Sequence, residues 1–521
     1  MADWFTCIVI FLLVIALLIT NIYVLAYFCH PDDKGSCIGW VMKIIVIIGL
    51  TLAWIQVLLL PIDVSNHRTF GGGLNMKLFW YIIYILTIIY ILVISPLASS
   101  YYDADYTWSC REKICHSLCW FFIYFIFFLL ITIILYASIG KADVPIKKIS
   151  CNFLENYQNS NSIFEMPKNY ETFDEDIEIK VNFLIYAIAV LLFASWLLFA
   201  FFGGIGLAAI PIDLFCSFKK RPTMRSAQIE TRKKKLIKDI EELKSLGQEL
   251  KQLESKNYNK RCKLSSERRN YDRKFSQFRA GYMLVDEEFN ILNAKNEARK
   301  AGNCVILLYY LLIPLGILAI ICTLLWIIQF CCSYFVRKNG RPGYPFLARM
   351  YIFFNDHDLA FLSFFIFSIL SLYLLLCVIK GNFKFGVRIL CCWEIFPMKK
   401  DGTYMNSFLF NVTLILLSSC SITQFCADCL EDYVVFTDIN IILNVQIRYL
   451  RFFKLFYKYH VFQYILFAVF LISLLILLIW PTDSLKTVLK KQDKNNKSEN
   501  DTNKNNNSSS GLNNSVPALG I

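Results

Sequence analysis

Three proline–x–aspartate segments carry the aspartates in this sequence that are candidates for binding an ion or a proton. They close long apolar stretches, at Leu60-Pro61-Ile62-Asp63, Ile210-Pro211-Ile212-Asp213 and Trp480-Pro481-Thr482-Asp483. Proline removes a backbone donor and clashes with the preceding turn, so it ends or kinks a helix and leaves the aspartate at the aqueous boundary. Helix punctuation is the simpler interpretation. The alternative is that the carboxylates bind an ion or a proton beside freed carbonyl groups.

A run of small residues precedes the second of these segments. Gly203, Gly204 and Gly206 stand in one apolar stretch that continues with Leu207-Ala208-Ala209. Small residues let neighbouring membrane helices approach each other closely. Close helix packing is therefore one interpretation, and a surface that lines a substrate pathway is the other. The run is not a dinucleotide-binding fingerprint, because neither a strand nor a ribose-binding acid accompanies it.

The 19 cysteines and five histidines form no standard catalytic or metal-binding motif. Most cysteines lie in or beside apolar stretches, where a free thiol behaves as a small apolar group. Cys110, Cys115, His116 and Cys119 could in principle ligate zinc, but their spacing fits no standard site. Asp356-His357-Asp358 is the densest titratable cluster, and we interpret it as the solvated start of an apolar stretch. We therefore expect no enzymatic activity and no bound metal or cofactor.

The composition indicates that membrane helices position all of these residues. Of 521 residues, 56% are hydrophobic and 18% are charged, whereas soluble domains average about 45–50% and about 25%. This excludes a disordered regulator, a secreted disulfide-rich protein and an ordinary cytosolic enzyme. A helix needs about 20 apolar residues to cross a bilayer. Nine stretches qualify: Cys7 to Cys29, Trp40 to Leu60, Leu78 to Ile94, Leu118 to Gly140, Val181 to Ile210, Cys304 to Cys332, Leu359 to Lys380, Met405 to Ala427 and His460 to Trp480.

The predicted fold class is therefore all-α, a polytopic helical membrane protein embedded in the lipid bilayer. Spans one to five occupy residues 1–210 and spans six to nine occupy residues 304–480. Lys and Arg near the span ends number 19 on one side and 15 on the other. Since the richer side tends to be cytoplasmic, we expect an outside or lumenal N-terminus and a cytoplasmic C-terminus. The tail, residues 481–521, is rich in Asn, Lys and Ser, and we expect it to be disordered.

The loop at residues 211–303 holds most of the excess positive charge. Its 23 Lys and Arg against 13 Asp and Glu give a net +10, out of +13 for the whole chain. A basic segment beside a bilayer favours anionic lipid or a protein partner, and nothing points to nucleic acid. Two sets of apolar residues recur at coiled-coil spacing: Ile229, Leu236, Leu243 and Leu250, then Phe275, Phe278, Tyr282, Val285, Phe289 and Leu292. With a turn at Asn257 to Arg269, they favour a cytoplasmic antiparallel coiled-coil hairpin, and two separate solvated helices are the alternative.

The segments around Pro61 and Pro211 resemble those of a known family. Leu59-Leu60-Pro61-Ile62-Asp63-Val64 and the stretch from Gly203 to Leu214 look like the signature segments of the limb region protein family. This family includes the lipocalin-interacting membrane receptor and the lysosomal cobalamin transport escort protein. The resemblance implies about nine spans, an outside N-terminus and a long cytoplasmic coiled-coil loop between the fifth and sixth spans. It also implies residence in the plasma membrane or an endolysosomal membrane.

Two functional hypotheses follow. The first is a multipass receptor or scaffold that binds a ligand or a partner transporter and docks cytoplasmic proteins through the basic coiled coil. The second is a transporter or channel for a small molecule or ion, in which the glycine-rich end of span five and its proline–aspartate break line a pathway. The resemblance supplies no ligand-contacting residue, because these family functions have no residue motif to match.

Overall fold

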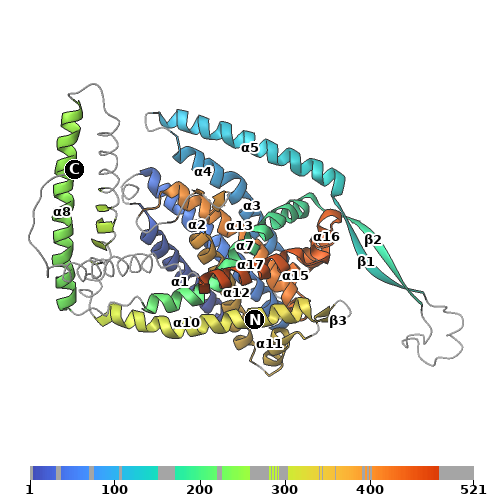
Figure 1. The fold of residues 1–521 in the computed structure, drawn as a ribbon. Helices are drawn as coiled ribbons and strands as arrows, with labels where there is room; N and C mark the ends of the chain where they lie inside the picture. The colour runs from blue at the N-terminus through green and yellow to red at the C-terminus, as the bar shows by residue number, and fades with distance from the viewer. Residues whose placement is uncertain are drawn as a thin grey trace, which may run out of the picture. The chain divides into compact units, whose positions relative to one another are not determined.

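We describe the computed structural model at residues 4–30, 37–69, 75–104, 108–150, 171–219, 226–258, 303–338, 341–342, 344–357, 359–385, 387–389, 393–395, 398 and 402–479, and at 278, 281–282, 284–286, 288–289 and 292. Figure 1 shows the fold. The predicted tail at residues 481–521 lies outside this part of the chain.

Long helices dominate the structure because a bilayer offers the backbone no partners outside its own segment. They are α1 (Trp4–Phe28), α2 (Cys37–Thr69), α3 (Met76–Ile89) with η2 (Tyr90–Ile94) and α4 (Ser95–Tyr102), α5 (Cys110–Ile139), α7 (Phe183–Lys219), α10 (Asn303–Phe330) with η3 (Cys331–Phe335), α12 (Ala360–Phe385), α13 (Met405–Cys429) and α17 (Val461–Ile479). Within the described residues, 8 helices are long and apolar enough to cross a membrane, and they coincide with predicted spans two to nine. The first predicted span falls on α1, whose 25 residues include the apolar stretch Val14–Phe28. The polytopic helical fold is confirmed.

Two of the prolines do not end their helices, so the punctuation interpretation is wrong at both. α2 continues past Pro61 to Thr69, and α7 continues past Pro211 to Lys219. A proline removes one backbone hydrogen bond, and packing against neighbouring helices lets a membrane helix tolerate that loss. Leu60 and Pro61 are both buried, in keeping with such packing. Pro481 lies outside the described residues.

The chain forms two compact units, Met1–Ala209 with Gln329–Ile521, and Ile210–Ile328. In the first unit α13 is the most enclosed candidate span, with 78% of its apolar window buried. It packs against α2, α12 and α4. By contrast, α5 lies at the edge of this unit, with 6% of its window buried (Figure 1). The least hydrophobic candidate span, α13, is thus also the one most covered by other parts of the protein.

The described segments between the spans contain β-strands and short helices. Antiparallel strands β1 (Lys141–Ser150) and β2 (Glu171–Lys180) form a two-stranded hairpin, and the shorter pairs are β3 (Arg337–Lys338) with β4 (Arg341–Pro342) and β5 (Val387–Ile389) with β6 (Trp393–Ile395). Short helices fill other connections: α11 (Phe346–Asp356), α14 (Glu431–Val434), α15 (Asp438–Asn440), η4 (Ile441–Ile447) and α16 (Arg451–Lys458). Figure 1 shows α15 and α16 on the side from which the β1–β2 hairpin projects.

Successive connections between nine membrane helices must lie on alternate faces of the bundle, and the contacts between the connections agree with this. On one face Cys29 contacts Thr403 and Asp103 contacts Asn406. On the opposite face Ala142 contacts Leu450 and Lys77 contacts Asp438. We call the second the β-hairpin face, formed by the connections α2–α3, α5–α7, α10–α12 and α13–α17. Which of the two faces is cytoplasmic stays a prediction.

The second unit holds part of the predicted coiled coil. α8 (Ser226–Tyr258) carries the first set of seam residues. A Cβ added at Gly247 would lie 3.2 Å from the Phe278 ring, and one added at Gly281 would lie 3.2 Å from the Leu243 side chain. The two predicted seams therefore lie side by side at these positions. The turn between them falls largely outside the described residues, as does Phe275, so the antiparallel hairpin stays a prediction.

Candidate functional site

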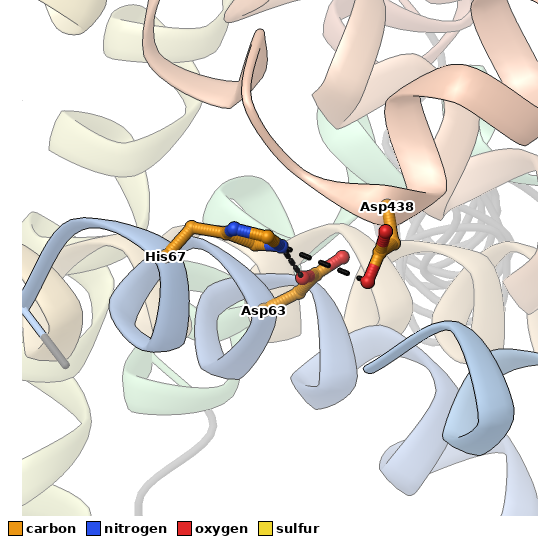
Figure 2. Close-up of side chains that lie close together, drawn as sticks. All are labelled: Asp63, His67 and Asp438. Atoms are coloured by element: carbon orange, nitrogen blue, oxygen red, sulfur yellow. Dashed lines mark ion pairs between the residues drawn. The ribbon is translucent and has the colours of Figure 1, made fainter. Parts of the chain in front are cut away.

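Three ionisable side chains from two distant parts of the chain meet at the β-hairpin face (Figure 2). Asp63 and His67 lie four residues apart on α2 and so share one face of that helix. Asp438 begins α15, in the connection between α13 and α17. His67 Nε2 lies 3.6 Å from Asp63 Oδ1 and 3.7 Å from Asp438 Oδ2. One potential ligand atom from each side chain lies within 4.8 Å of the other two. Among the described residues, no other group of three or more His, Cys, Asp or Glu side chains meets this criterion.

Neighbouring elements fix two of the three side chains. Asp63 is fully buried, and its Oδ2 accepts hydrogen bonds from Trp80 Nε1 at 2.9 Å and from the Ile439 backbone N–H at 3.3 Å. Asp438 Oδ2 accepts the Lys77 backbone N–H at 3.1 Å, in the first turn of α3. Asp63 is therefore covered, because α2 continues past it and α3 and α15 shield its carboxylate. Its position at the aqueous boundary of the bilayer stays a prediction.

A second cluster at the same face is a buried ion pair. Arg448 donates from Nη1 to Asp428 Oδ1 at 3.0 Å, and the two side chains are 20% and 7% exposed. Tyr334 OH donates to Asp428 Oδ2 at 2.6 Å, and Gln463 Nε2 donates to the same oxygen at 3.4 Å. The Asp428 carboxylate raises the pKa of the Arg448 guanidinium, which keeps that group charged. Both carboxylate oxygens thus have donors, as a buried charge requires.

Polar side chains along α13 are hydrogen-bonded within the bundle. The pairs are Ser419 with Gln56, Ser421 with Ser195, Gln424 with Trp196, Ser418 with the Leu414 carbonyl and Thr423 with the Ser419 carbonyl. The first three pairs join α13 to α2 and α7, and the last two lie within α13. Interhelical hydrogen bonds are worth about 0.6 kcal/mol on average in membrane proteins. Their main effect here is to fix α13 in one orientation against α2 and α7.

The glycine-rich run packs helices together. A Cβ added at Gly206 would overlap the backbone carbonyl of Cys377 on α12, and one added at Gly381 would overlap the backbone carbonyl of Phe202 on α7. Gly204 faces α17, where an added Cβ would lie 2.9 Å from the Leu466 carbonyl oxygen. Gly203 faces the Phe199 ring of its own helix. α7 and α12 therefore cross with their backbones in contact, each with a glycine at the crossing.

Charged residues attach the β1–β2 hairpin to α16. Asp143 and Glu178 are paired across the two strands, and like charges in that position repel. Arg451 offsets this repulsion, because its Nε donates to Asp143 Oδ2 at 3.1 Å and its Nη2 donates to Glu178 Oε1 at 2.6 Å. Lys141 Nζ adds a contact of 2.9 Å to Glu178. The hydrogen bond from Lys141 and the charges of Lys141 and Arg451 lower the pKa of the Glu178 carboxyl.

Arg451→Gln is expected to loosen the hairpin and to make its attachment more sensitive to acid. The lowered pKa of Glu178 stabilises the attachment at pH values above the unfolded-state pKa, and this contribution is lost as the pH falls through the folded-state pKa. Removing Arg451 raises that folded-state pKa, so the loss begins at a higher pH. Hydrogen exchange of the β1 and β2 amides against pH measures the effect, which high salt should weaken. Lys458→Gln, at an exposed position of α16, is the control, and equal profiles for both variants would contradict the prediction.

The remaining predicted site residues do not join these clusters. Pro211 and Asp213 belong to the second unit, where Pro211 is buried and Asp213 is half-buried. Cys110, Cys115 and Cys119 are exposed on α5. His116 Nε2 instead accepts the Trp120 indole N–H at 3.0 Å. The structure therefore offers no support for zinc at the cysteines among the described residues.

Comparison with known proteins decides the family. Residues 6–269 match the family profile of LMBR1-like membrane proteins. A LIMR family protein of Dictyostelium discoideum is 31% identical over 85% of this chain and 92% of its own length. The chain belongs to the LMBR1-like membrane protein family. The resemblance of the Pro61 and Pro211 segments to the limb region protein family is thus confirmed, and the protein is a multipass integral membrane protein.

Other relatives are similar to this LMBR1-like protein to different extents. A LIMR family protein of Arabidopsis thaliana is 29% identical over 87% of this chain and 91% of its own length. A Dictyostelium discoideum protein named as a probable lysosomal cobalamin transporter is 26% identical over 40% of this chain and 39% of its own length. No solved structure matches the chain.

Sequence reasoning missed two members of the Asp63 cluster in this LMBR1-like protein. The spacing of Asp63 and His67 could have indicated that they lie together, because residues four apart share a helix face. We did not use this spacing, because we expected the helix to end at Pro61. Asp438 gave no local signal, because it is far from Asp63 along the chain. Its neighbour Ile439, whose backbone N–H donates to Asp63, is 376 positions away.

Proposed function

We propose that this LMBR1-like protein is a multipass membrane receptor or scaffold, with its N-terminus outside or in a lumen and its C-terminus in the cytoplasm. The observation that carries this proposal is the closed polar interior around α13, where Ser419, Ser421 and Gln424 bond to residues of α2 and α7. Polar side chains that hydrogen-bond across helices hold membrane helices together. Groups already bonded to one another are less available to water or a substrate, so they support a fixed bundle more than a transport pathway.

The β-hairpin face is the side on which we place the ligand or partner protein. It includes the β1–β2 hairpin, η4 and α16. Arg451 and Lys454 of α16 form ion pairs with Asp143 of β1 and Asp176 of β2, and these pairs join α16 to the hairpin. Beside these pairs, α16 exposes the apolar side chains of Phe452 and Leu455. A rigid surface that combines charged and apolar side chains suits recognition of another protein.

Reconstitution into liposomes tests the proposal. We expect vesicles that contain the purified protein to release protons or cobalamin no faster than protein-free vesicles. A flux that Asp213→Asn or Ser421→Ala abolishes would overturn the receptor or scaffold role. Lys458→Gln is the matched control, since it is exposed on α16 and lies outside the bundle interior.

Docking of a cytoplasmic partner is proposed for the basic coiled-coil loop. A groove of about 620 Å³ runs between α8 and the second seam, lined by Leu243, Gly247, Phe278, Tyr282, Val285 and Phe289. Lys244, Lys251 and Asp286 also line it, and because the two lysines outnumber the aspartate, an amphipathic helix with acidic flanks is the partner we propose. The basic flanks at 219–225 and 232–235 suit an anionic leaflet. If Leu243→Pro left partner capture and sedimentation with anionic vesicles both unchanged, the docking role would be wrong.

A transporter is the second candidate function. Two observations favour it: a relative is named as a probable lysosomal cobalamin transporter, and Asp63 is a fully buried carboxylate within a candidate span. Ionisable side chains inside membrane segments commonly mark ion or substrate pathways. A protein-dependent flux in the liposome experiment would select this candidate.

A further inference from the structure

We propose that Asp63, His67 and Asp438 bind one divalent transition-metal ion of the Zn²⁺ class at the β-hairpin face. The three side chains offer one imidazole nitrogen and two carboxylate oxygens, a donor set that Zn²⁺ accepts. Figure 2 shows the imidazole and both carboxylates directed toward one another. This proposal reverses the expectation from sequence that the protein binds no metal, and it is independent of the receptor or scaffold proposal.

The distances between the three ligand atoms suit a shared ion better than direct hydrogen bonds. Two ligands about 2.1 Å from a tetrahedral ion lie about 3.4 Å apart. His67 Nε2 lies 3.6 and 3.7 Å from the two carboxylate oxygens, beyond the roughly 2.7–3.2 Å of an N–H···O hydrogen bond. A protonated His67 that merely paired with both carboxylates would be expected to lie closer to at least one of them.

Two buried polar atoms in the cluster point to the same ligand. Asp63 Oδ1 and His67 Nε2 have no hydrogen-bond partner among the described residues. An oxygen of a fully buried carboxylate is costly without a partner, and the other oxygen of Asp63 already accepts the Trp80 and Ile439 N–H groups. Oδ1 is therefore left facing His67, and a cation between the two atoms would satisfy both.

Charge and access also fit a divalent ion. Two carboxylates and a neutral imidazole carry a charge of −2, which one divalent cation neutralises. The side chains of His67 and Asp438 are 27% and 28% exposed, so the ion can enter from the aqueous side and retain a water as fourth ligand. Hydrogen bonds from Trp80 and from the Lys77 backbone hold the two carboxylates in place. A bound ion would clamp α15 to the end of α2.

Titration of the purified full-length protein tests the site. After removal of metal with a chelator, isothermal titration with Zn²⁺ is expected to show one ion per chain and a rise in the thermal unfolding midpoint. Mg²⁺ and Ca²⁺ should bind far more weakly, because they prefer more oxygen ligands. His67→Ala and Asp438→Asn should each weaken Zn²⁺ binding at least about 100-fold. Trp80→Phe keeps the ring but removes the N–H, and should weaken it about 10-fold.

The control variant is His357→Ala, which removes a histidine flanked by two aspartates in the sequence but outside the cluster. It should leave Zn²⁺ binding unchanged. The proposal is overturned if folded wild-type protein takes up no Zn²⁺, or if His67→Ala binds it as tightly as the wild type. Loss of the ion on replacing Cys110, Cys115 and Cys119 with serine, with the His67 variant unaffected, would assign the metal to the cysteines and equally refute the site.

Discussion

Gly206→Ala is expected to lower the free energy of unfolding by about 3 kcal/mol, an unusually large effect for one added methyl group. The new Cβ would overlap the backbone carbonyl of Cys377, which cannot rotate away as a side chain could. α7 and α12 must therefore separate where they cross, and overpacking of this kind costs about 1–3 kcal/mol. Alanine otherwise favours a helix over glycine by about 1 kcal/mol, so any loss of stability must come from the crossing.

Thermal unfolding in detergent, followed by tryptophan fluorescence, measures the effect. Gly381→Ala should be similarly damaging, because its Cβ would overlap the Phe202 carbonyl in the same crossing. The double variant should lose less than the sum of the two, since the first substitution already separates the helices. Gly316→Ala is the matched control, because its Cβ would lie 3.2 Å from the Phe215 ring, which can move. An equal loss in the control would show that the crossing is not the cause.

Arg448→Met is the second substitution expected to have a large effect, with a loss of about 3–5 kcal/mol. Removing one partner of a buried ion pair leaves the other charge without compensation. Asp428 is only 7% exposed, and the substitution removes the Arg448 donor from Oδ1, while Tyr334 and Gln463 donate to Oδ2. The buried carboxylate must then take up a proton or draw water into the bundle, and each reduces stability.

A double-mutant cycle tests this explanation. Asp428→Asn combined with Arg448→Met removes both charges of this ion pair, so the double variant should be more stable than Arg448→Met alone, although still below the wild type. Arg451→Met supplies the comparison for an exposed arginine that also pairs with carboxylates. If Arg448→Met cost no more than Arg451→Met, then burial of the Asp428 charge would not be what sets the effect.

Much of the fold could be predicted from the sequence, because long apolar stretches leave the backbone few alternatives in a bilayer. Spans two to nine coincide with helices of the structure, and the Pro61 and Pro211 segments identified the family. The ends of the helices were less predictable. Pro61 does not end α2, because α3 and α15 pack against the part of α2 that follows it. The sequence near Pro61 does not reveal this packing. The β1–β2 hairpin was missed because its strands are polar and stabilised by α16.

The candidate site shows the same division more sharply. From the sequence we can read that Asp63 and His67 are four residues apart, and that Gly203, Gly204 and Gly206 could admit a close neighbour. The structure adds that both residues lie on α2, that the neighbour is α12 for Gly206 and α17 for Gly204, and that Asp438 completes the cluster. Spacing along the chain limits which residues can share a helix face, whereas contacts between helices depend on how the whole bundle excludes lipid and satisfies its buried polar groups.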